Sequence, residues 1–322
     1  MNPQEKQDDV VIPQEIQLAE ILLGQRKPDE ALRAVNAYLD EHFDDVPGIV
    51  MAAHILMASN RIGLAQALMR HATTLKPEVS DLWSDLGYCY QEGSDLEEGE
   101  KCFIKALQRD PNNLFALSNL AQLYVVTGQP LKAINCADKA LRLNTPVVET
   151  QFNRGLAMLQ LGNWREGWQG YEFNLGKHKA RKERSYGTIP RWTGVKDLTV
   201  IAYGEQGIGD EISFASCIPD LMKQNKVIIE CDKRLEGLFK RSFDCPVYGT
   251  LKDAGVRWPL SHDVDASVAF GSLPQYFRNA DDEFPGTPYL KADPQRRLQW
   301  RTLLDSLGDK PKVGIAWVGG LK

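Results

Sequence analysis

Trp83-Ser84-Asp85-Leu86-Gly87-Tyr88-Cys89-Tyr90 is the stretch of this 322-residue sequence that decides the fold of its first half. Phe103, Ala106 and Pro111 follow it, where the second helix of a hairpin would hold an aromatic residue, a small residue and a helix breaker. A step of 34 residues from Gly87 reaches another small residue in either direction along the chain. The stretch therefore belongs to an internal repeat.

Three positions of this repeat recur through five consecutive units. They are a first small position (Ala19, Ala53, Gly87, Ala121, Gly155), a second small position (Ala31, Ala65, Gly99, Ala133, Gly167) and a bulky position (Leu22, Leu56, Tyr90, Tyr124, Met158). Small residues let two paired helices approach closely, and the bulky residue fills the seam between them. The period predicts helical hairpins at about 13–42, 46–76, 80–110, 114–144 and 148–175.

The pattern W-x2-L-G-x2-Y at this period is that of the tetratricopeptide repeat. No hairpin of this kind buries its apolar face alone, so the units stack into an α-solenoid with a concave surface. The spacing places six side chains on or beside that surface: Tyr88, Gln91, Asn119, Gln122, Val125 and Asn153. As a stripe they predict a groove for a protein or peptide partner, whereas for any one of them alone a solvated polar helix face is the better interpretation.

The composition excludes several classes of protein. The chain has 38 basic and 43 acidic residues, a net charge of −5, which argues against nucleic-acid binding. No apolar stretch reaches the roughly 20 residues of a membrane-spanning helix, and Met1–Val10 does not resemble a secretory signal. The six cysteines form no C-x-x-C pair and the histidines are not at metal-ligand spacing. We expect a cytoplasmic protein with no bound metal or cofactor.

The repeat ends near residue 175 and a different pattern follows. The basic stretch Lys177–Arg184 suits a phosphate or an anionic membrane, but most such runs are solvated connectors, which is the interpretation we favour here. Short β-branched runs then alternate with amphipathic stretches, which predicts a Rossmann-like parallel sheet covered on both faces, and hence an α + α/β chain. Strands are expected at 198–203, 226–231, 246–248, 266–270 and 312–317, and helices at 210–224, 234–243 and 294–307. The expected layout is a polar tail (1–12), the solenoid (13–175), a basic linker (176–197), the sheet domain (198–311) and the start of another unit (312–322).

The loop after the first expected strand is the place where a ligand would bind, beyond the carboxyl end of the sheet. It reads Gly204-Glu205-Gln206-Gly207-Ile208-Gly209-Asp210, and its candidate substrate-binding residues are Gly204, Gln206, Gly207 and Gly209. The glycines would let the backbone pass close to a ligand. Their G-x-x-G-x-G order is not that of nicotinamide enzymes, and no G-K-[ST] of a P-loop ATPase follows.

Two carboxylates of this loop are candidates for catalysis. Asp210 would accept a proton from an acceptor hydroxyl as a general base, or would cap the helix that follows, and spacing alone favours the cap. Glu205 is the weaker candidate, since it would serve as a base or simply pair with a nearby cation. The sequence leaves both alternatives open.

Six short motifs distributed over most of the chain carry a resemblance. They are Gly170–Glu172, Pro190–Gly194, Gly204–Asp210, Ser272–Pro274, Pro288–Leu290 and Val313–Trp317. Together with the repeats they resemble bacterial tetratricopeptide-repeat glycosyltransferases, which are similar to heptosyltransferases and to O-linked N-acetylglucosamine transferase. The resemblance implies a GT-B fold, whose first half holds the acceptor and whose second half holds a nucleotide-sugar donor. It also implies a general base at Asp210, with Gly207 and Gly209 lining the cleft.

The chain departs from this family where the donor half would begin. Val313–Trp317 would be its first strand and the sequence ends at Lys322, so no positions exist for donor-binding residues. The first hypothesis is a glycosyltransferase-like protein, truncated here, whose repeats bind a protein or glycan acceptor. The second hypothesis is a non-catalytic adaptor that has lost the donor half and kept binding. Under either hypothesis we expect the isolated chain to be inactive as an enzyme.

Overall fold

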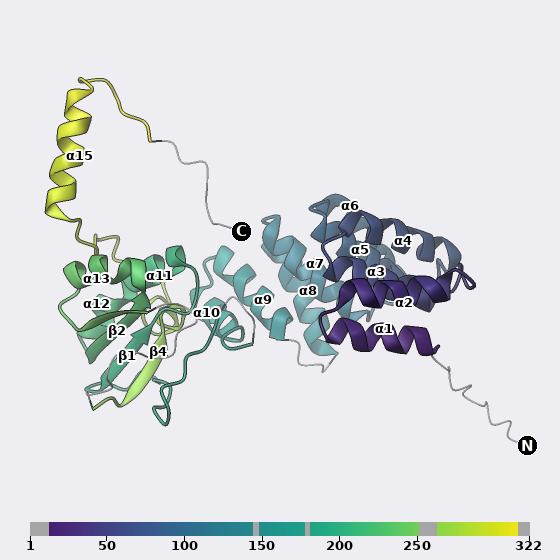
Figure 1. Cartoon of the computed structure of the whole chain (residues 1–322). Coiled ribbons are helices and arrows are strands. Elements are labelled where there is room, and N and C mark those ends of the chain that lie inside the picture. The colour runs from purple at the N-terminus through teal and green to yellow at the C-terminus, as the bar shows by residue number, and fades with distance from the viewer. Residues whose placement is uncertain (1–12, 144–147, 178–180, 251–262, 315–322) are drawn as a thin grey trace, which may run out of the picture. The chain divides into compact units, whose positions relative to one another are not determined.

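A computed structural model describes residues 13–143, 148–177, 181–250 and 263–314. They belong to two compact units, Met1–Leu161 and Gly162–Lys322. Figure 1 shows helices throughout the first unit and a sheet with helices in the second. The expected polar tail, residues 1–12, lies outside the described residues.

The described chain up to Glu172 forms two helices for each of the five expected hairpins, which confirms the repeats. They are α1 (Gln14–Gly24), α2 (Pro28–Leu39), α3 (Val46–Ala58), α4 (Ile62–Leu75), α5 (Ser80–Glu92), α6 (Leu96–Arg109), α7 (Leu114–Val126), α8 (Pro130–Arg142), α9 (Val148–Gln160) and α10 (Trp164–Glu172). The first nine lie in the first unit, as a solenoid of paired helices. The units divide after Leu161, so α10 belongs to the second unit, although the sequence period continues through it.

Small residues bring the paired helices together as the sequence predicts. A Cβ placed on Gly87 would lie 2.8 Å from the ring of Phe103, and one placed on Gly99 would lie 3.2 Å from the Gly87 carbonyl oxygen. Phe103 is fully buried, as are Ala53 and Ala121 at the first small position. The contact between α5 and α6 therefore requires a residue with no side chain at Gly87.

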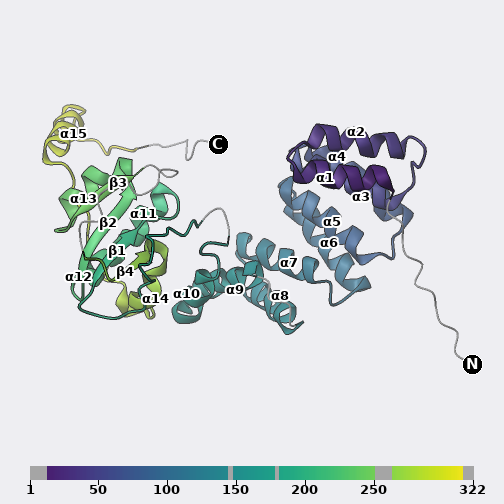
Figure 2. The same cartoon turned by 60° about the horizontal axis from the view of Figure 1, so that its bottom comes forward.

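The sheet of the second unit has four parallel strands in the order β3-β2-β1-β4. The strands are β1 (Thr199–Tyr203), β2 (Lys226–Asp232), β3 (Val247–Thr250) and β4 (Ala266–Ala269), close to the expected positions. Figure 2 shows them side by side in a second view. The fifth expected strand is not seen: residues 312–314 form no strand, and 315–317 lie outside the described part.

The helices of this unit are shorter than the sequence suggested. They are α11 (Ile208–Phe214), α12 (Ile218–Met222), α13 (Glu236–Ser242), α14 (Pro274–Phe277) and α15 (Pro294–Ser306). The single helix expected over 210–224 is wrong, because a 3₁₀ turn at Ala215–Cys217 separates α11 from α12. Pro219 lies in the first turn of α12, where its missing N–H is harmless, but it cannot continue a preceding helix.

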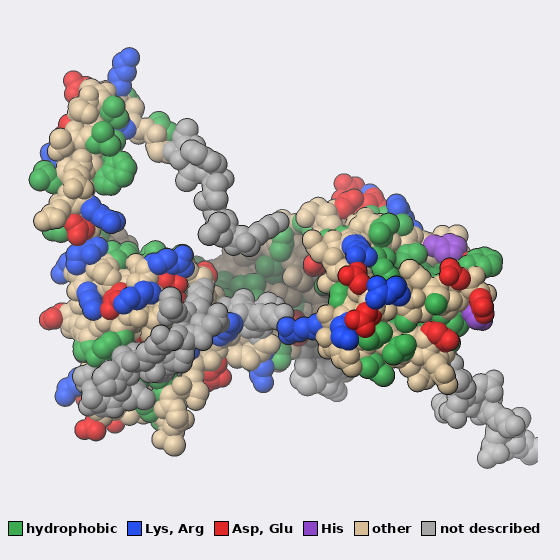
Figure 3. All heavy atoms as spheres, in the orientation of Figure 1, with side chains coloured by type: hydrophobic (Ala, Val, Ile, Leu, Met, Phe, Trp, Pro, Cys, Tyr) green, Lys and Arg blue, Asp and Glu red, His purple; other side chains and the backbone are tan. Residues whose placement is uncertain are grey.

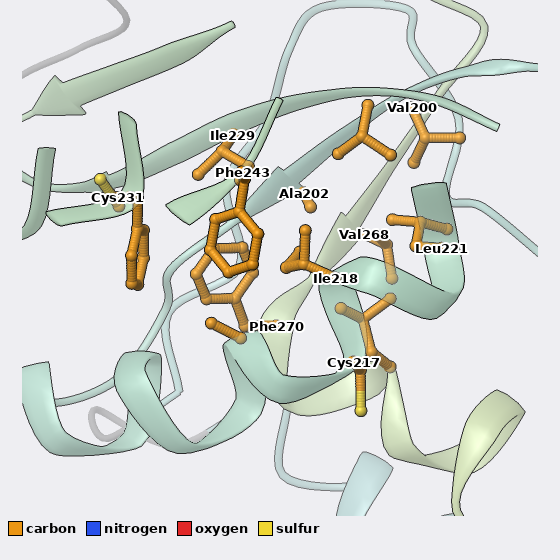
Figure 4. Close-up of a cluster of buried hydrophobic side chains, with 14 of the residues drawn as sticks. Val200, Ala202, Cys217, Ile218, Leu221, Ile229, Cys231, Phe243, Val268 and Phe270 are labelled. Atoms are coloured by element: carbon orange, nitrogen blue, oxygen red, sulfur yellow. The ribbon is translucent and has the colours of Figure 1, made fainter. Parts of the chain in front are cut away.

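The two faces of the sheet are covered differently. On one face, Val200, Ala202 and Ile229 pack against helix residues such as Ile218 and Leu221 (Figure 4). On the other face, Ile201, Tyr203 and Ile228 pack against Leu175 and Tyr186, which precede the sheet in the chain. The segment expected to be a basic linker therefore contributes to a cover of the sheet.

Helix α15 is present as expected but has no buried residue. Its large apolar side chains, Leu298, Trp300, Leu303 and Leu304, are exposed, as is Leu307 directly after it. Figure 3 shows green apolar side chains on the surface of this helix. It adds nothing to the core of the sheet.

Replacing Phe103 with alanine is expected to lower the free energy of unfolding by about 3–5 kcal/mol, because the ring is fully buried in the α5–α6 contact. Phe115→Ala is the matched control, since Phe115 is 44% exposed, and it should cost less than about 1 kcal/mol. Urea denaturation followed by circular dichroism measures both. Equal losses would contradict the packing described here.

Candidate functional site

One cavity of the first unit gathers half of the predicted groove residues. Its volume is about 420 Å³, and it is lined by Leu114, Phe115, Ser118, Asn119, Gln122, Glu149 and Asn153. Helices α7 and α9 supply all of these side chains. Asn119, Gln122 and Asn153 thus meet at one place, and their role toward a partner stays a prediction.

The remaining predicted groove residues lie beside this cavity or support it. The Tyr88 ring contacts the edge of Phe115, with 5.8 Å between the ring centroids. Gln91 Nε2 donates a hydrogen bond to Gln122 Oε1 (3.2 Å), while Gln91 Oε1 is buried without a hydrogen-bond partner. The side chain of Val125 packs at the edge of the core formed by α5 to α9. The backbone carbonyl of Val125 accepts a hydrogen bond from Gln160 Nε2 (2.9 Å).

The hydrogen bonds within the groove determine what its amides offer to a partner. Asn119 Nδ2 donates to the Phe115 carbonyl (2.8 Å), which leaves Asn119 Oδ1 as an acceptor. Gln122 Oε1 accepts from Gln91, which leaves Gln122 Nε2 as a donor. Asn119 Oδ1 and Gln122 Nε2 are therefore an acceptor and a donor that these two bonds do not use, close to an exposed phenylalanine; Asn119 is itself largely buried, whereas Gln122 is exposed.

Two important residues of this cavity were not among the predicted ones. Phe115 is 44% exposed and Glu149 is exposed, although both line the cavity. They lie 34 residues apart, so they occupy the same position in successive repeats. That equivalence is the signal that would have found them.

In the second unit, Glu205 is the partner of a buried arginine. The Glu205 and Arg181 side chains are each 1% exposed, and Arg181 Nη2 lies 3.2 Å from Glu205 Oε1. Gln206 Nε2 (2.8 Å) and the Gly271 N–H (3.1 Å) donate to the same oxygen. Burial raises the pKa of the Glu205 carboxyl, an effect that Arg181 opposes. Of the two roles considered for Glu205, the structure shows pairing with a cation.

Asp210 lies inside α11 rather than at its N-cap, which corrects the position expected for it. The helix begins at Ile208 and Gly207 is the capping residue. The Gly207 N–H donates to Asp210 Oδ2 (3.1 Å), so the carboxylate still stabilises the start of the helix. The side chain is exposed, and its action as a base stays a prediction.

Gly204 and Gln206 each have a structural role, and their contacts with a substrate stay predictions. A Cβ on Gly204 would lie 2.2 Å from Cδ of Glu211, so this glycine makes room for a buried glutamate. Gln206 Oε1 accepts from the Tyr171 hydroxyl (2.8 Å), and its Nε2 is bonded to Glu205. A Cβ on Gly209 would meet no atom within 4 Å, so the space beside it is open.

The expectation of a solvated connector is wrong for two arginines of the basic stretch. Besides the buried Arg181, Arg184 Nη1 lies 2.7 Å from Oε1 of Glu230, whose side chain is 1% exposed. The Tyr186 hydroxyl donates to the other oxygen of Glu230 (3.0 Å). Glu205 follows β1, and Glu230 lies within β2 opposite Tyr203, the last residue of β1, so these bonds attach the segment near the carboxyl edge of the sheet. Residues 178–180 lie outside the described part.

Helix α10 joins the same edge through aromatic side chains. Trp168 Nε1 donates to the Arg278 carbonyl (2.7 Å), and Trp164 Nε1 donates to Asp281 Oδ1 (2.6 Å). Glu172, at the end of α10, accepts from the Ser272 hydroxyl (2.6 Å). Hydrogen bonds thus connect the motifs at 170–172, 204–210 and 272–274 at the carboxyl edge of the sheet. We call this hydrogen-bonded cluster the joint.

A second cavity, of about 210 Å³, lies beside this joint at the carboxyl ends of β1 and β4. Its polar lining includes Glu172, Arg191, Thr193, Ser272 and Gln275. Arg191 is half exposed, and its Nη1 lies 3.9 Å from Glu172 Oε1. The motif at 190–194 therefore contributes to a polar cavity where ligands of parallel sheets bind.

The part of the chain that the structure describes contains no group of three or more histidine, cysteine or carboxylate side chains placed to hold a metal ion. Among the same residues, no helix combines the length and the apolar character that crossing a lipid bilayer requires.

Comparison with known proteins agrees with the helical unit. Residues 80–113 and 102–135 match two family profiles, both described as tetratricopeptide repeat. The chain carries tetratricopeptide repeats. Among solved structures it is similar to MamA (16% identity, TM-score 0.43, 48% of this chain and 91% of MamA). It is also similar to YrrB, which is described as a tetratricopeptide-repeat protein with an unusual peptide-binding site. The identity is 14% and the TM-score 0.40, and the match covers 49% of this chain and 82% of YrrB.

Two curated relatives extend this comparison. Protein FlbA of Caulobacter vibrioides is 26% identical over 319 residues, which cover 93% of this chain and 54% of FlbA. The repeat-containing protein trd-1 of Caenorhabditis elegans is 25% identical over 126 residues, 39% of this chain and 16% of trd-1. The chain thus spans about half the length of FlbA.

Removing the partner of a buried charge is expected to destabilise the second unit. Arg181→Met should lower its free energy of unfolding by about 3–5 kcal/mol, because Glu205 would remain buried and unpaired. Adding Glu205→Gln should recover part of this loss. Lys223→Met, which breaks a pair whose lysine is 71% exposed, is the control and should cost less than about 1 kcal/mol. Thermal unfolding of the variants ranks their stabilities. A double variant that is no more stable than Arg181→Met would contradict the role given to the buried ion pair.

Proposed function

We propose that this chain is a protein-binding adaptor whose repeats hold an extended segment of a partner protein along α7 and α9. The observation that carries the proposal is the cavity of about 420 Å³ in which three predicted amide residues surround an exposed phenylalanine. A solvated polar helix face needs neither a cavity nor an exposed aromatic floor. Concave sites with a largely apolar lining and a few placed polar groups are typical binding sites.

The amides suit the backbone of such a segment. An extended peptide offers a carbonyl and an N–H at each residue, and these need partners when water is excluded. Asn119 Oδ1 and Gln122 Nε2 provide an acceptor and a donor next to the apolar floor. Backbone hydrogen bonds of this kind give affinity with little dependence on sequence, while the cavity selects a side chain.

Replacing both amides should weaken peptide binding without unfolding the repeats. Peptides of twelve residues selected from a random display library by the intact chain are the probes, and fluorescence anisotropy measures their affinity. Asn119→Ala with Gln122→Ala should weaken binding by about five- to a hundredfold, since two hydrogen bonds are lost. Gln108→Ala with Asn112→Ala, both exposed outside the cavity, is the matched control. Failure to select any peptide, or equal affinities of the two double variants, would contradict the proposal.

A second candidate function, sugar transfer, is favoured by the polar cavity of about 210 Å³ beyond β1 and β4. The cavity would hold an acceptor, and Asp210, which lies on α11 and is not one of the residues that line the cavity, would take a proton from the acceptor hydroxyl as sugar passes from a nucleotide-sugar donor. This candidate function also rests on the resemblance of the motifs, several of which meet at this cavity. The donor, the glycan acceptor and the GT-B arrangement remain part of this proposal alone.

A panel of labelled nucleotide sugars, incubated with the chain and with candidate acceptors, separates the two candidate functions. The adaptor proposal predicts no transfer. Transfer that falls about 10²–10⁴-fold in Asp210→Asn would instead establish the enzyme, because a general base contributes about that factor. Glu211→Gln is unsuitable as a control because Glu211 is buried, so Asp244→Asn, which changes an exposed carboxylate just after α13, serves instead.

A further inference from the structure

We infer that the partner segment of this groove carries a bulky apolar residue flanked by lysine or arginine. The inference rests on the proposed function and adds to it the chemistry of the partner. It has two parts, the apolar anchor and the flanking positive charge, which different side chains of the groove determine.

The anchor follows from the floor of the cavity. Leu114 and Phe115 line it, and the Phe115 ring is supported from the side by Tyr88 at 5.8 Å. A ring that is 44% exposed in a cavity of about 420 Å³ leaves apolar surface to be covered by a large side chain. The partner therefore places a leucine, phenylalanine or similar residue here.

The flanking charge follows from the repeat. Glu149 lines the cavity, and the 34-residue period relates it to Phe115 and to Asp81 on the preceding helix α5. The same period relates Asn119, another lining residue, to Asp85. Positions that face the groove in one repeat thus carry carboxylates in the neighbouring repeats.

Basic side chains do not balance these carboxylates on the first helices of the repeats. Helix α7 has no charged residue, and α5 has only Asp81, Asp85 and Glu92. The single arginine of α9, Arg154, bonds Asp138 on α8 (2.7 Å). Asp85 has a basic neighbour, since its Oδ2 lies 3.3 Å from His54 Nε2. Glu149 lines the cavity and is exposed. A largely apolar cavity with the exposed carboxylate of Glu149 in its lining favours a cationic segment and disfavours an acidic one.

The test uses three pools of fluorescein-labelled eight-residue peptides with blocked ends. Each pool has leucine or phenylalanine at the centre and glycine and serine elsewhere, and the pools differ in having lysine, glutamine or glutamate on both sides of the centre. Anisotropy titration of the intact chain at low and high salt gives the affinities. We expect lysine-flanked peptides to bind about tenfold more tightly than glutamate-flanked ones at low salt, with a smaller ratio at high salt.

Substitution at Glu149 identifies the source of the preference. Glu149→Gln should reduce the ratio about threefold, and Glu149→Lys should reverse its direction, because the substitution changes the charge at the cavity itself. Glu97→Gln is the matched control: it removes one negative charge from α6, where Glu97 is 80% exposed and pairs with Lys101.

The outcomes separate this inference from the proposed function. If no pool binds, the groove does not hold extended peptides and both fail. If all three pools bind equally, or if Glu149→Lys leaves the order unchanged, the groove binds peptides but the inference about charge is overturned. Lysine preference that Glu149→Lys reverses, and that Glu97→Gln leaves intact, supports it.

Discussion

The close approach of paired helices at their small residues is the contact on which the first unit depends. Gly87 lies against the fully buried Phe103, and a Cβ there would come within 2.8 Å of the ring. Because a small residue recurs at this position in each repeat, the helices stack with a regular offset and the first helices line one surface. The groove of α7 and α9 exists because this packing holds their exposed residues together. The binding function proposed for the groove therefore depends on the stacking.

In the second unit, buried charge determines the arrangement around the edge of the sheet. Glu205 and Glu230 would be costly to bury alone, and Arg181 and Arg184 pair with them. These bonds hold the segment before the sheet against its carboxyl edge, and α10 joins it through Trp164, Trp168 and Glu172. Residues that resemble catalytic motifs in the sequence therefore have a structural explanation, since they build the joint itself. This structural explanation does not account for the cavity beside the joint.

The repeats could be predicted from the sequence because their signal is local and periodic. Two small positions and one bulky position in each unit define the helices to within a few residues, and even Asn119, Gln122 and Asn153 could be placed together. The joint could not be predicted, because Arg181 and Glu205 are far apart in sequence and a basic run looks the same whether its partners are water or buried carboxylates. The break after α11 was missed because hydrophobic periodicity continues across Pro219. Asp210 was assigned to the wrong helical position because the helix begins at Ile208.

The measurement that most directly tests the central claim, peptide binding in the groove, is site-specific photocrosslinking. A photoreactive p-benzoylphenylalanine introduced in place of Gln122 should capture a library-selected peptide upon irradiation, and an excess of unlabelled peptide should abolish the crosslink. The same group in place of Gln108, on the exposed surface of α6, should capture none. A peptide that binds the chain but crosslinks equally from both positions, or only from Gln108, would contradict the account.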